Sequence, residues 1–149
     1  RRLRLHTRVP VVLPERVDEA LLDWLGKTRL QKVVVLHINH ENEIDEAVAA
    51  ACAKLKAAGA TVLNQAVLLR SVNDSADAQA RLSERCFAAG VLPYYLFVLD
   101  RVAGAAHFDV SESQAQALMQ ALAARLPGYL VPRLVREIAG QPAKTLLPW

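Results

Sequence analysis

The sequence predicts an α/β fold built around a parallel sheet, and three observations support this class. Short β-rich runs recur along the chain, amphipathic stretches lie between them, and the two alternate roughly every 30 residues, the size of a βαβ unit. Several of the β-rich runs are nearly continuous apolar or β-branched stretches, as strands covered on both faces are. This alternation favours parallel strands connected by helices.

Five strands are expected in this sheet. They are predicted over 3–7 (LRLHT), 33–39 (VVVLHIN), 61–69 (TVLNQAVLL), 94–100 (YYLFVLD) and 129–138 (YLVPRLVREI). The last strand contains Pro132, and because proline cannot donate to a central ladder it is the least secure of the five. Ligands of parallel sheets bind beyond the C-terminal ends of the strands, so the residues that close each strand are the first place to look for a site.

Four amphipathic helices are expected beside these strands. They are predicted over 17–27, 44–58, 75–89 and 111–126. The alanine-rich second helix has acids in its first turn and lysines in its last, which complements the helix dipole, and it stops at Gly59. The third stops in the same way at Gly90, while the fourth begins with Ser-Glu-Ser and ends before Pro127-Gly128.

Length and composition indicate one soluble globular domain over 1–149, with β/α units over 1–126 and a C-terminal segment over 127–149. Hydrophobic residues make up 53% and charged residues 22% of the chain. The net charge of +3 is spread among acids, so we expect no nucleic-acid partner, and no run is apolar enough to predict a membrane span. Because the chain begins with Arg1 rather than methionine, we expect it to be a piece of a longer protein.

The cysteines and the absent motifs narrow the function further. Cys52 and Cys86 each fall within a helical pattern, so we expect reduced thiols and a cytoplasmic protein rather than a disulfide framework. The sequence has no Walker loop, no Gly-x-Gly-x-x-Gly, no Gly-x-Ser-x-Gly and no Cys-x-x-Cys motif. Phosphate-loop nucleotide binding and elbow-serine hydrolysis are therefore disfavoured.

Polar residues gather where the predicted strands end, and each has a simpler alternative reading. His37 and His40, with Glu41 and Glu43, have the types of a metal site, but no third ligand is evident and the acids equally suit the start of the next helix. Asp100 is placed either to contact a substrate or to cap a helix. Similarly, 73–74 (Asn-Asp) before Ser75 is typical of a turn and N-cap.

Lys144 is the residue whose interpretation depends most on context. By pattern alone a lysine near the end of a chain is a solvated side chain. The preceding segment, 140–143 (Gly-Gln-Pro-Ala), predicts a tight, extended loop that would hold it in place.

Taken in order, six segments resemble the lysine 2,3-aminomutase family of radical S-adenosylmethionine enzymes. The segments are HTRVPVVLPERV (6–17), HINHENEI (37–44), LNQAVLLRSVND (63–74), LPYYLFVLD (92–100), GAAHFDV (104–110) and GYLVPRLVREIAGQPAKT (128–145). They cover almost the whole chain with consistent spacing. The fifth and sixth resemble the branch that makes β-lysine for attachment to elongation factor P.

The resemblance implies an isomerase that converts (S)-α-lysine to (R)-β-lysine. In the family a [4Fe–4S] cluster cleaves S-adenosylmethionine, and the resulting radical acts on lysine held by pyridoxal phosphate; the cofactors carry the difficult chemistry and the protein positions them. It also implies a fold, the C-terminal portion of a partial (β/α)6 TIM-like radical SAM barrel. Free lysine or a protein-bound lysine would be the immediate substrate.

The same resemblance assigns roles to five residues. Lys144 matches the lysine that binds pyridoxal phosphate covalently, a role that requires a neutral amine. Asp100 and Glu137 match two acids around the substrate side-chain ammonium, and the family often has aspartate at the second position. His37 and Gln65 match residues near the methionyl part of S-adenosylmethionine.

Departures from the family pattern limit what this chain can do alone. Arg8 matches only loosely, as a contact to an anionic group near the cofactors. The Cys-x-x-x-Cys-x-x-Cys cluster motif is absent, and Cys52 and Cys86 cannot supply three ligands, so we expect the cluster ligands to lie outside this chain. Ser75 stands where one structural zinc cysteine of other family members would fall, so no metal ligands are expected. We expect the chain alone to be inactive; the alternative is a non-catalytic α/β binding or scaffold module.

Overall fold

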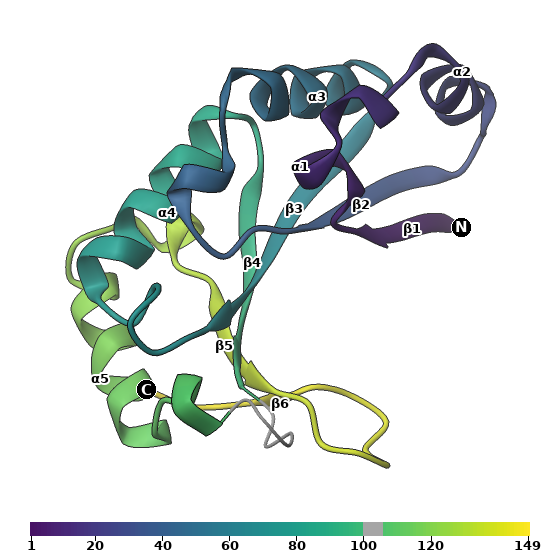
Figure 1. Ribbon diagram of the computed structural model, residues 1–149. Helices are drawn as coiled ribbons and strands as arrows, with labels where there is room; N and C mark the ends of the chain where they lie inside the picture. The colour runs from purple at the N-terminus through teal and green to yellow at the C-terminus, as the bar shows by residue number, and fades with distance from the viewer. Residues whose placement is uncertain (100–105) are drawn as a thin grey trace.

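A computed structural model describes residues 1–99 and 106–149 and shows one sheet flanked by helices (Figure 1). The sheet has six strands in the order β1-β2-β3-β4-β5-β6. The strands are β1 (Arg2–Thr7), β2 (Gln31–His37), β3 (Ala60–Leu68), β4 (Leu92–Val98), β5 (Arg133–Arg136) and β6 (Thr145–Leu146). The first five run parallel, and β6 pairs with β5 in the antiparallel direction. The predicted α/β class with a mostly parallel sheet is therefore confirmed.

The helices connect the parallel strands. They are α1 (Val9–Val12), α2 (Glu19–Lys27), α3 (Glu46–Ala57), α4 (Ala76–Ala88) and α5 (Glu112–Ala123), with 3-10 turns η1 (Pro14–Arg16), η2 (Glu41–Glu43), η3 (Ala106–Phe108) and η4 (Gly128–Leu130). Each of the four long helices begins at a side chain that accepts from its third helical N–H; these N-caps are Asp18, Asp45, Ser75 and Ser111. Local capping thus sets where the helices start.

The main core lies between the sheet and helices α3, α4 and α5, which line one side of the curled sheet in Figure 1. Strand side chains of one parity point into it, including Leu36, Leu68 and Leu96, all fully buried. Cys52 of α3 and Met119 of α5 meet them from the helices. Burial of each large side chain contributes about 1.5–3 kcal/mol, so this layer stabilises the fold.

Side chains of the opposite parity form the other face of the sheet, which we call the open face. Its members from β1 to β4 include His6, Val35, His37, Leu63, Gln65, Tyr95 and Phe97, as the strand register shows. The pairs His6↔Val35 and His37↔Gln65 lie side by side on neighbouring strands. This face carries the polar and aromatic groups that the core excludes.

The structure corrects the prediction after the first strand and in the C-terminal segment. Only Arg133–Arg136 of the predicted strand over 129–138 is extended, because the chain first turns through η4 and Pro132 stands just before the ladder. The short strand β6, directly after Lys144, and the one-turn helix α1 were not predicted. Both are too short to leave a periodic pattern. Among the described residues, no helix has the length and apolar character that a membrane crossing needs.

Candidate active site

His37 and Gln65 form a pair at the carboxyl end of the open face. Their strands place them directly opposite one another, and Nε2 of Gln65 lies 3.1 Å from Nε2 of His37. In this arrangement the amide nitrogen donates and the His37 ring accepts, which assigns the ring proton to Nδ1. Burial, and to a smaller extent the Arg8 guanidinium, lower the pKa of His37, which favours the same neutral form.

Gln65 also has an uncommitted acceptor. Its Oε1 atom is buried and has no hydrogen-bond partner within the ranges that the structure describes. A buried amide oxygen without a donor costs free energy, so such an atom often marks a place where a ligand or water binds. The open face therefore offers an acceptor to a donor group that binds beside His37.

Lys144 reaches the same face from the segment after β5. Its Nζ atom lies 5.7 Å from the centroid of the Tyr95 ring and 5.4 Å from that of Phe97. The side chain is half-buried there, not fully solvated as pattern alone indicates. Its surroundings are thus aromatic rings on β4 rather than open solvent.

His6 connects Lys144 with the His37–Gln65 pair. The rings of His6 and His37 meet edge to face, with centroids 6.3 Å apart. Burial lowers the pKa of His6, and the charges of Arg4, His37 and Lys144 lower it further, while the Gln65 amide acts in the opposite direction. These influences show that β1, β2, β3 and the Lys144 segment converge on one region of the open face.

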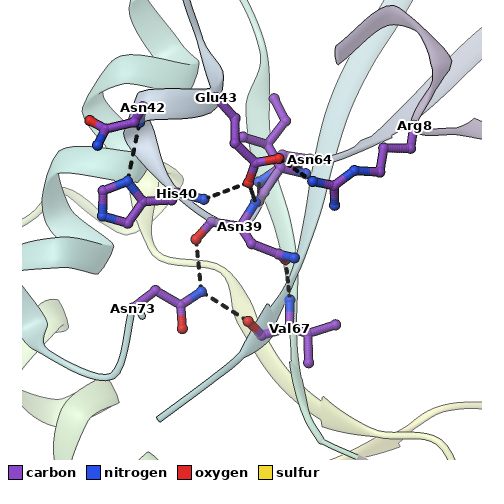
Figure 2. A network of polar contacts seen from close by, with 9 residues as sticks. Arg8, Asn39, His40, Asn42, Glu43, Asn64, Val67 and Asn73 are labelled. Atoms are coloured by element: carbon purple, nitrogen blue, oxygen red, sulfur yellow. Dashed lines mark hydrogen bonds and ion pairs between the residues drawn. The ribbon is translucent and has the colours of Figure 1, made fainter. Parts of the chain in front are cut away.

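A network of amides continues the β2–β3 pairing beyond the last ladder residues (Figure 2). The Asn64 side chain accepts from the Ile38 N–H at 2.9 Å and donates to the Ile38 carbonyl at 3.0 Å. The Asn39 side chain accepts from the Val67 N–H at 2.9 Å. Asn64 is buried and points away from the open face, so its role is structural, although it precedes Gln65 directly.

Glu43 and Arg8 close the turn that follows β2 (Figure 2). Oε1 of Glu43 accepts from the N–H groups of Asn39 and His40 at 2.7 and 3.0 Å, and its other oxygen accepts from Arg8 at 2.5 Å. Nδ1 of His40 accepts from the Asn42 N–H at 3.2 Å. The acids and His40 therefore organise the η2 turn and not the start of the next helix, whose N-cap is Asp45, and Arg8 pairs with a protein carboxylate.

The metal interpretation of His37 and His40 finds no support in this geometry. The two rings have separate hydrogen-bond partners, Gln65 and the Asn42 N–H. In the ranges 1–99 and 106–149, no three His, Cys, Asp or Glu side chains are arranged to hold a metal ion.

Glu137 occupies a different place from Lys144. It is exposed after the end of β5 and lines a groove with Arg70, Leu99 and Glu112, among others. Asp100, predicted to be its partner, lies outside the described residues. The structure thus places Lys144, His37 and Gln65 on the same face, and it puts Glu137 at the carboxyl edge of the sheet.

The two cysteines do not fit an iron–sulfur cluster. Cys52 and Cys86 are fully buried in the core between sheet and helices. Burial raises the pKa of the Cys52 thiol to about 11 and that of Cys86 to about 12, whereas cluster ligation requires thiolates.

Sequence reasoning missed several residues of this region. Tyr95 and Phe97 were read only as part of an apolar strand, and their orientation toward Lys144 depends on the chain crossing from β5 to β6. His6 was given no role, because the sequence does not show that its ring meets that of His37. For Tyr95 and Phe97, strand parity was an available signal, because it sets them on the side opposite Leu96.

Comparison with known proteins first defines the class. The fold resembles the crystal structure of a radical SAM methyltransferase from Sphaerobacter thermophilus, with a TM-score of 0.63 and 18% identity, over 89% of this chain and 40% of that one. At this identity the likeness shows the fold alone. The chain thus has part of the TIM-like α/β architecture found in a radical SAM enzyme.

No family model matches the chain, and the further comparison is with sequence relatives. L-lysine 2,3-aminomutase of Escherichia coli (strain K12) is 54% identical over 147 residues, which are 99% of this chain and 43% of the relative. The L-lysine 2,3-aminomutase of Haemophilus influenzae is 52% identical, and the match covers 97% of this chain and 43% of the relative. The L-lysine 2,3-aminomutase of Clostridium subterminale is 36% identical, and the match covers 96% of this chain and 34% of the relative. Over nearly its entire length the chain is a homologue of the L-lysine 2,3-aminomutases, and it spans about two fifths of the length of the first two.

Proposed function

We propose that the chain is the C-terminal part of a radical SAM, pyridoxal phosphate-dependent aminomutase, an isomerase that converts (S)-α-lysine to (R)-β-lysine. The observation that carries the proposal is the position of Lys144. Its amine lies against Tyr95 and Phe97 on the same face as the His37–Gln65 pair. The homology to L-lysine 2,3-aminomutases supports this activity.

Lys144 would hold pyridoxal phosphate. The fit rests on a half-buried amine that faces two aromatic rings, a setting that suits a planar cofactor. None of the ion pairs found among the described residues includes Lys144, so no carboxylate in those ranges holds its amine. When bound, the cofactor would activate the amino group of the substrate, while the protein orients it and excludes water.

His37 and Gln65 would hold the methionyl part of S-adenosylmethionine. Oε1 of Gln65 is a buried acceptor without a partner among the described residues, and an amino group is the donor it would take. The [4Fe–4S] cluster does not fit this chain, because Cys52 and Cys86 are core thiols; its ligands would come from outside the 149 residues.

Asp100 and Glu137 would bind the side-chain ammonium of lysine. The family resemblance supports this pairing, and Glu137 lines a groove at the carboxyl edge of the sheet. A substrate without the ammonium would leave both carboxylates unpaired, which would make the site selective for lysine.

The biological setting that we propose is the cytoplasmic modification of elongation factor P with β-lysine. Segments 104–110 and 128–145, whose sequences resemble that branch of the family, support this assignment. Reduced, buried cysteines are consistent with a cytoplasmic location.

The assignment of Lys144 is tested by covalent labelling. The protein made from the complete gene is incubated with pyridoxal phosphate, reduced with borohydride and digested, and the labelled peptide is mapped. We expect one label, on Lys144, and none in Lys144→Ala. Exposed Lys27, replaced by alanine in a matched control, should leave the labelling unchanged. Label on any other lysine of the wild-type protein would remove Lys144 from the proposed role.

A second test addresses substrate choice. Asp100→Ala in the complete gene product should weaken lysine turnover far more than it alters the free energy of unfolding. Unchanged lysine kinetics in this variant would remove Asp100 from the site.

A non-catalytic binding module is the second candidate function, because neither cysteine of this chain can ligate a cluster. Iron and sulfide analysis of the complete gene product distinguishes the binding module from the radical SAM enzyme. Four irons and four sulfides per protein are expected for a [4Fe–4S] enzyme. An absence of both would favour the binding module.

A further inference from the structure

The backbones of β2 and β3 stop pairing at the point where the site begins. Their ladder ends at His37↔Gln65, which is also the contact that orients the His37 ring. Beyond it, the next backbone groups bond to side chains of Asn64 and Asn39 instead of to each other. The two strand ends can therefore diverge without leaving buried polar groups unpaired.

Asn73 is the residue that ties these diverging ends together. It is 1% exposed, and its side-chain nitrogen donates to the carbonyls of Asn39 and Val67 at 2.8 and 2.9 Å. Its side-chain oxygen accepts from the Leu69 N–H at 2.8 Å. One amide thus links the end of β2 to two positions at the end of β3, as Figure 2 shows for Asn39 and Val67.

Asn73 is itself held from two directions. Its carbonyl accepts from Nε2 of buried Gln79 at 2.9 Å, which fastens it to α4. Its N–H donates to the Leu69 carbonyl at 3.1 Å, closing a turn in which Ser71 has a φ of 62°. A left-handed conformation at a serine costs free energy and persists where surrounding contacts impose it. This turn is therefore a rigid support for the Asn73 side chain.

We propose that Asn73, acting through Asn39, is a positioning residue for the His37–Gln65 pair. The inference deepens the proposed function, on which it rests for the role of that pair in holding S-adenosylmethionine. Asn39 lies two residues after His37 and Val67 lies two after Gln65, so both stand on the same strands just beyond the pair. Fixing their separation fixes the distance at which the His37 and Gln65 side chains meet.

Removal of the Asn73 amide would release this spacing. The Asn39 and Val67 carbonyls would each lose a buried donor, and the strand ends would move to hydrate them. The contact between Gln65 and His37 would then weaken, and the His37 ring would lose the partner that keeps its proton on Nδ1. A residue that only stabilises the fold would leave this tautomer unchanged.

The test observes the tautomer directly. The complete gene product is labelled with ¹⁵N-histidine, and the His37 signals are assigned by their absence from His37→Gln. We expect Nδ1–H in the wild-type protein and a shift toward a tautomer mixture in Asn73→Ala. The control is Leu122→Ala, a core residue of α5, which destabilises the fold without touching this network. No shift in Asn73→Ala, or an equal shift in Leu122→Ala, would overturn the proposal.

A second variant keeps the test informative if Asn73→Ala does not fold. Asn39→Ala removes only the side-chain bond to the Val67 N–H and should produce a smaller shift in the same direction. An unchanged His37 tautomer in Asn39→Ala would then overturn the proposal.

Steady-state kinetics test whether the change in the His37 tautomer affects the binding of S-adenosylmethionine. In an active enzyme, Asn73→Ala should raise KM for S-adenosylmethionine about tenfold while kcat changes less. An unchanged KM would overturn the link to the site. A wild-type protein without aminomutase activity would instead refute the proposed function, and the tautomer measurement would still decide the positioning role.

Discussion

Two regions around the candidate site differ in how their polar side chains are bonded. Between the ends of β2 and β3, Glu43 and Asn73 each satisfy several buried or half-buried backbone groups. After β5, Lys144 contacts aromatic rings, and none of the described ion pairs includes it. The first region is saturated with hydrogen bonds, whereas the second presents a group without a committed partner.

The difference in hydrogen bonding between the two regions indicates how a site of this kind is assembled. Buried polar groups that all have hydrogen-bond partners make a structure rigid. Removing one partner leaves the other group buried without a hydrogen bond, which costs free energy. A lysine that must react with a carbonyl compound cannot be bound in this way, because an ion pair would hold its amine protonated. We therefore expect substitutions in the two regions to separate stability from activity.

The largest expected effect is on activity, in Lys144→Ala. In the complete gene product this variant should lose lysine turnover by a factor on the order of 10³ or more, because a residue that binds the cofactor covalently has no substitute. The free energy of unfolding should fall by no more than about 1 kcal/mol, the size of an exposed cation–π contact. Turnover assays and urea denaturation measure the two quantities. A large loss of stability would break the comparison.

The largest effect on stability is expected from Glu43→Ala. This substitution leaves the Asn39 and His40 N–H groups and Arg8 without their common acceptor, and should cost about 2–3 kcal/mol. Glu41 makes an ion pair with half-exposed Arg81, so Glu41→Ala is the matched control at about 0–1 kcal/mol. Urea denaturation of both variants measures the difference, and equal costs would contradict the view that Glu43 organises the turn.

The sequence was sufficient for most of the fold. Continuous apolar runs, capping residues and glycine stops predicted the five parallel strands and four long helices, because these signals are local. Strand 129–138 was too long because the brief η4 turn ahead of Pro132 has no periodicity of its own. Strand β6 was missed because two residues are extended only through pairing with β5.

The site was predictable only in part. The end of a strand pointed to His37, the family resemblance pointed to Gln65, and parity places the two on one face. Asn73 was read as part of a turn, since nothing in the letters distinguishes a surface turn from one whose side chain bridges two strands. The reach of Lys144 to Tyr95 and Phe97 depends on the path of residues 137–143, which no local pattern specifies.

A smaller effect concerns how firmly Lys144 is held. A double-mutant cycle with Lys144→Ala and Phe97→Leu should give a coupling energy of about 0.5–1 kcal/mol, the size of an exposed cation–π contact. Urea denaturation of the four proteins measures it. A coupling above about 2 kcal/mol would mean that Lys144 is anchored as a structural residue, which would weaken the contrast with Glu43.

The smallest effect is the pH dependence that the open-face histidines impose. The pKa values of His6 and His37 lie below the ordinary 6.5, so the folded state favours neutral rings. Below about pH 6.5 the unfolded chain binds more protons than the folded chain, and stability falls as pH drops through the folded values. Above about pH 6.5 both rings are neutral in the folded and unfolded states, so they no longer make stability depend on pH. Urea midpoints should be level from pH 8 to 7 and decline slightly toward pH 5.5.

Replacing both rings tests this origin. The variant His6→Gln/His37→Gln should have a flatter profile between pH 7 and 5.5, whereas exposed His107, replaced by glutamine, should leave the wild-type slope unchanged. If the slope survives in the double variant, the decline belongs to other groups, and the open face does not hold its histidines neutral. If the slope disappears, the folded state keeps the rings of His6 and His37 neutral. The two histidines beside Gln65 would then account for the loss of stability at low pH.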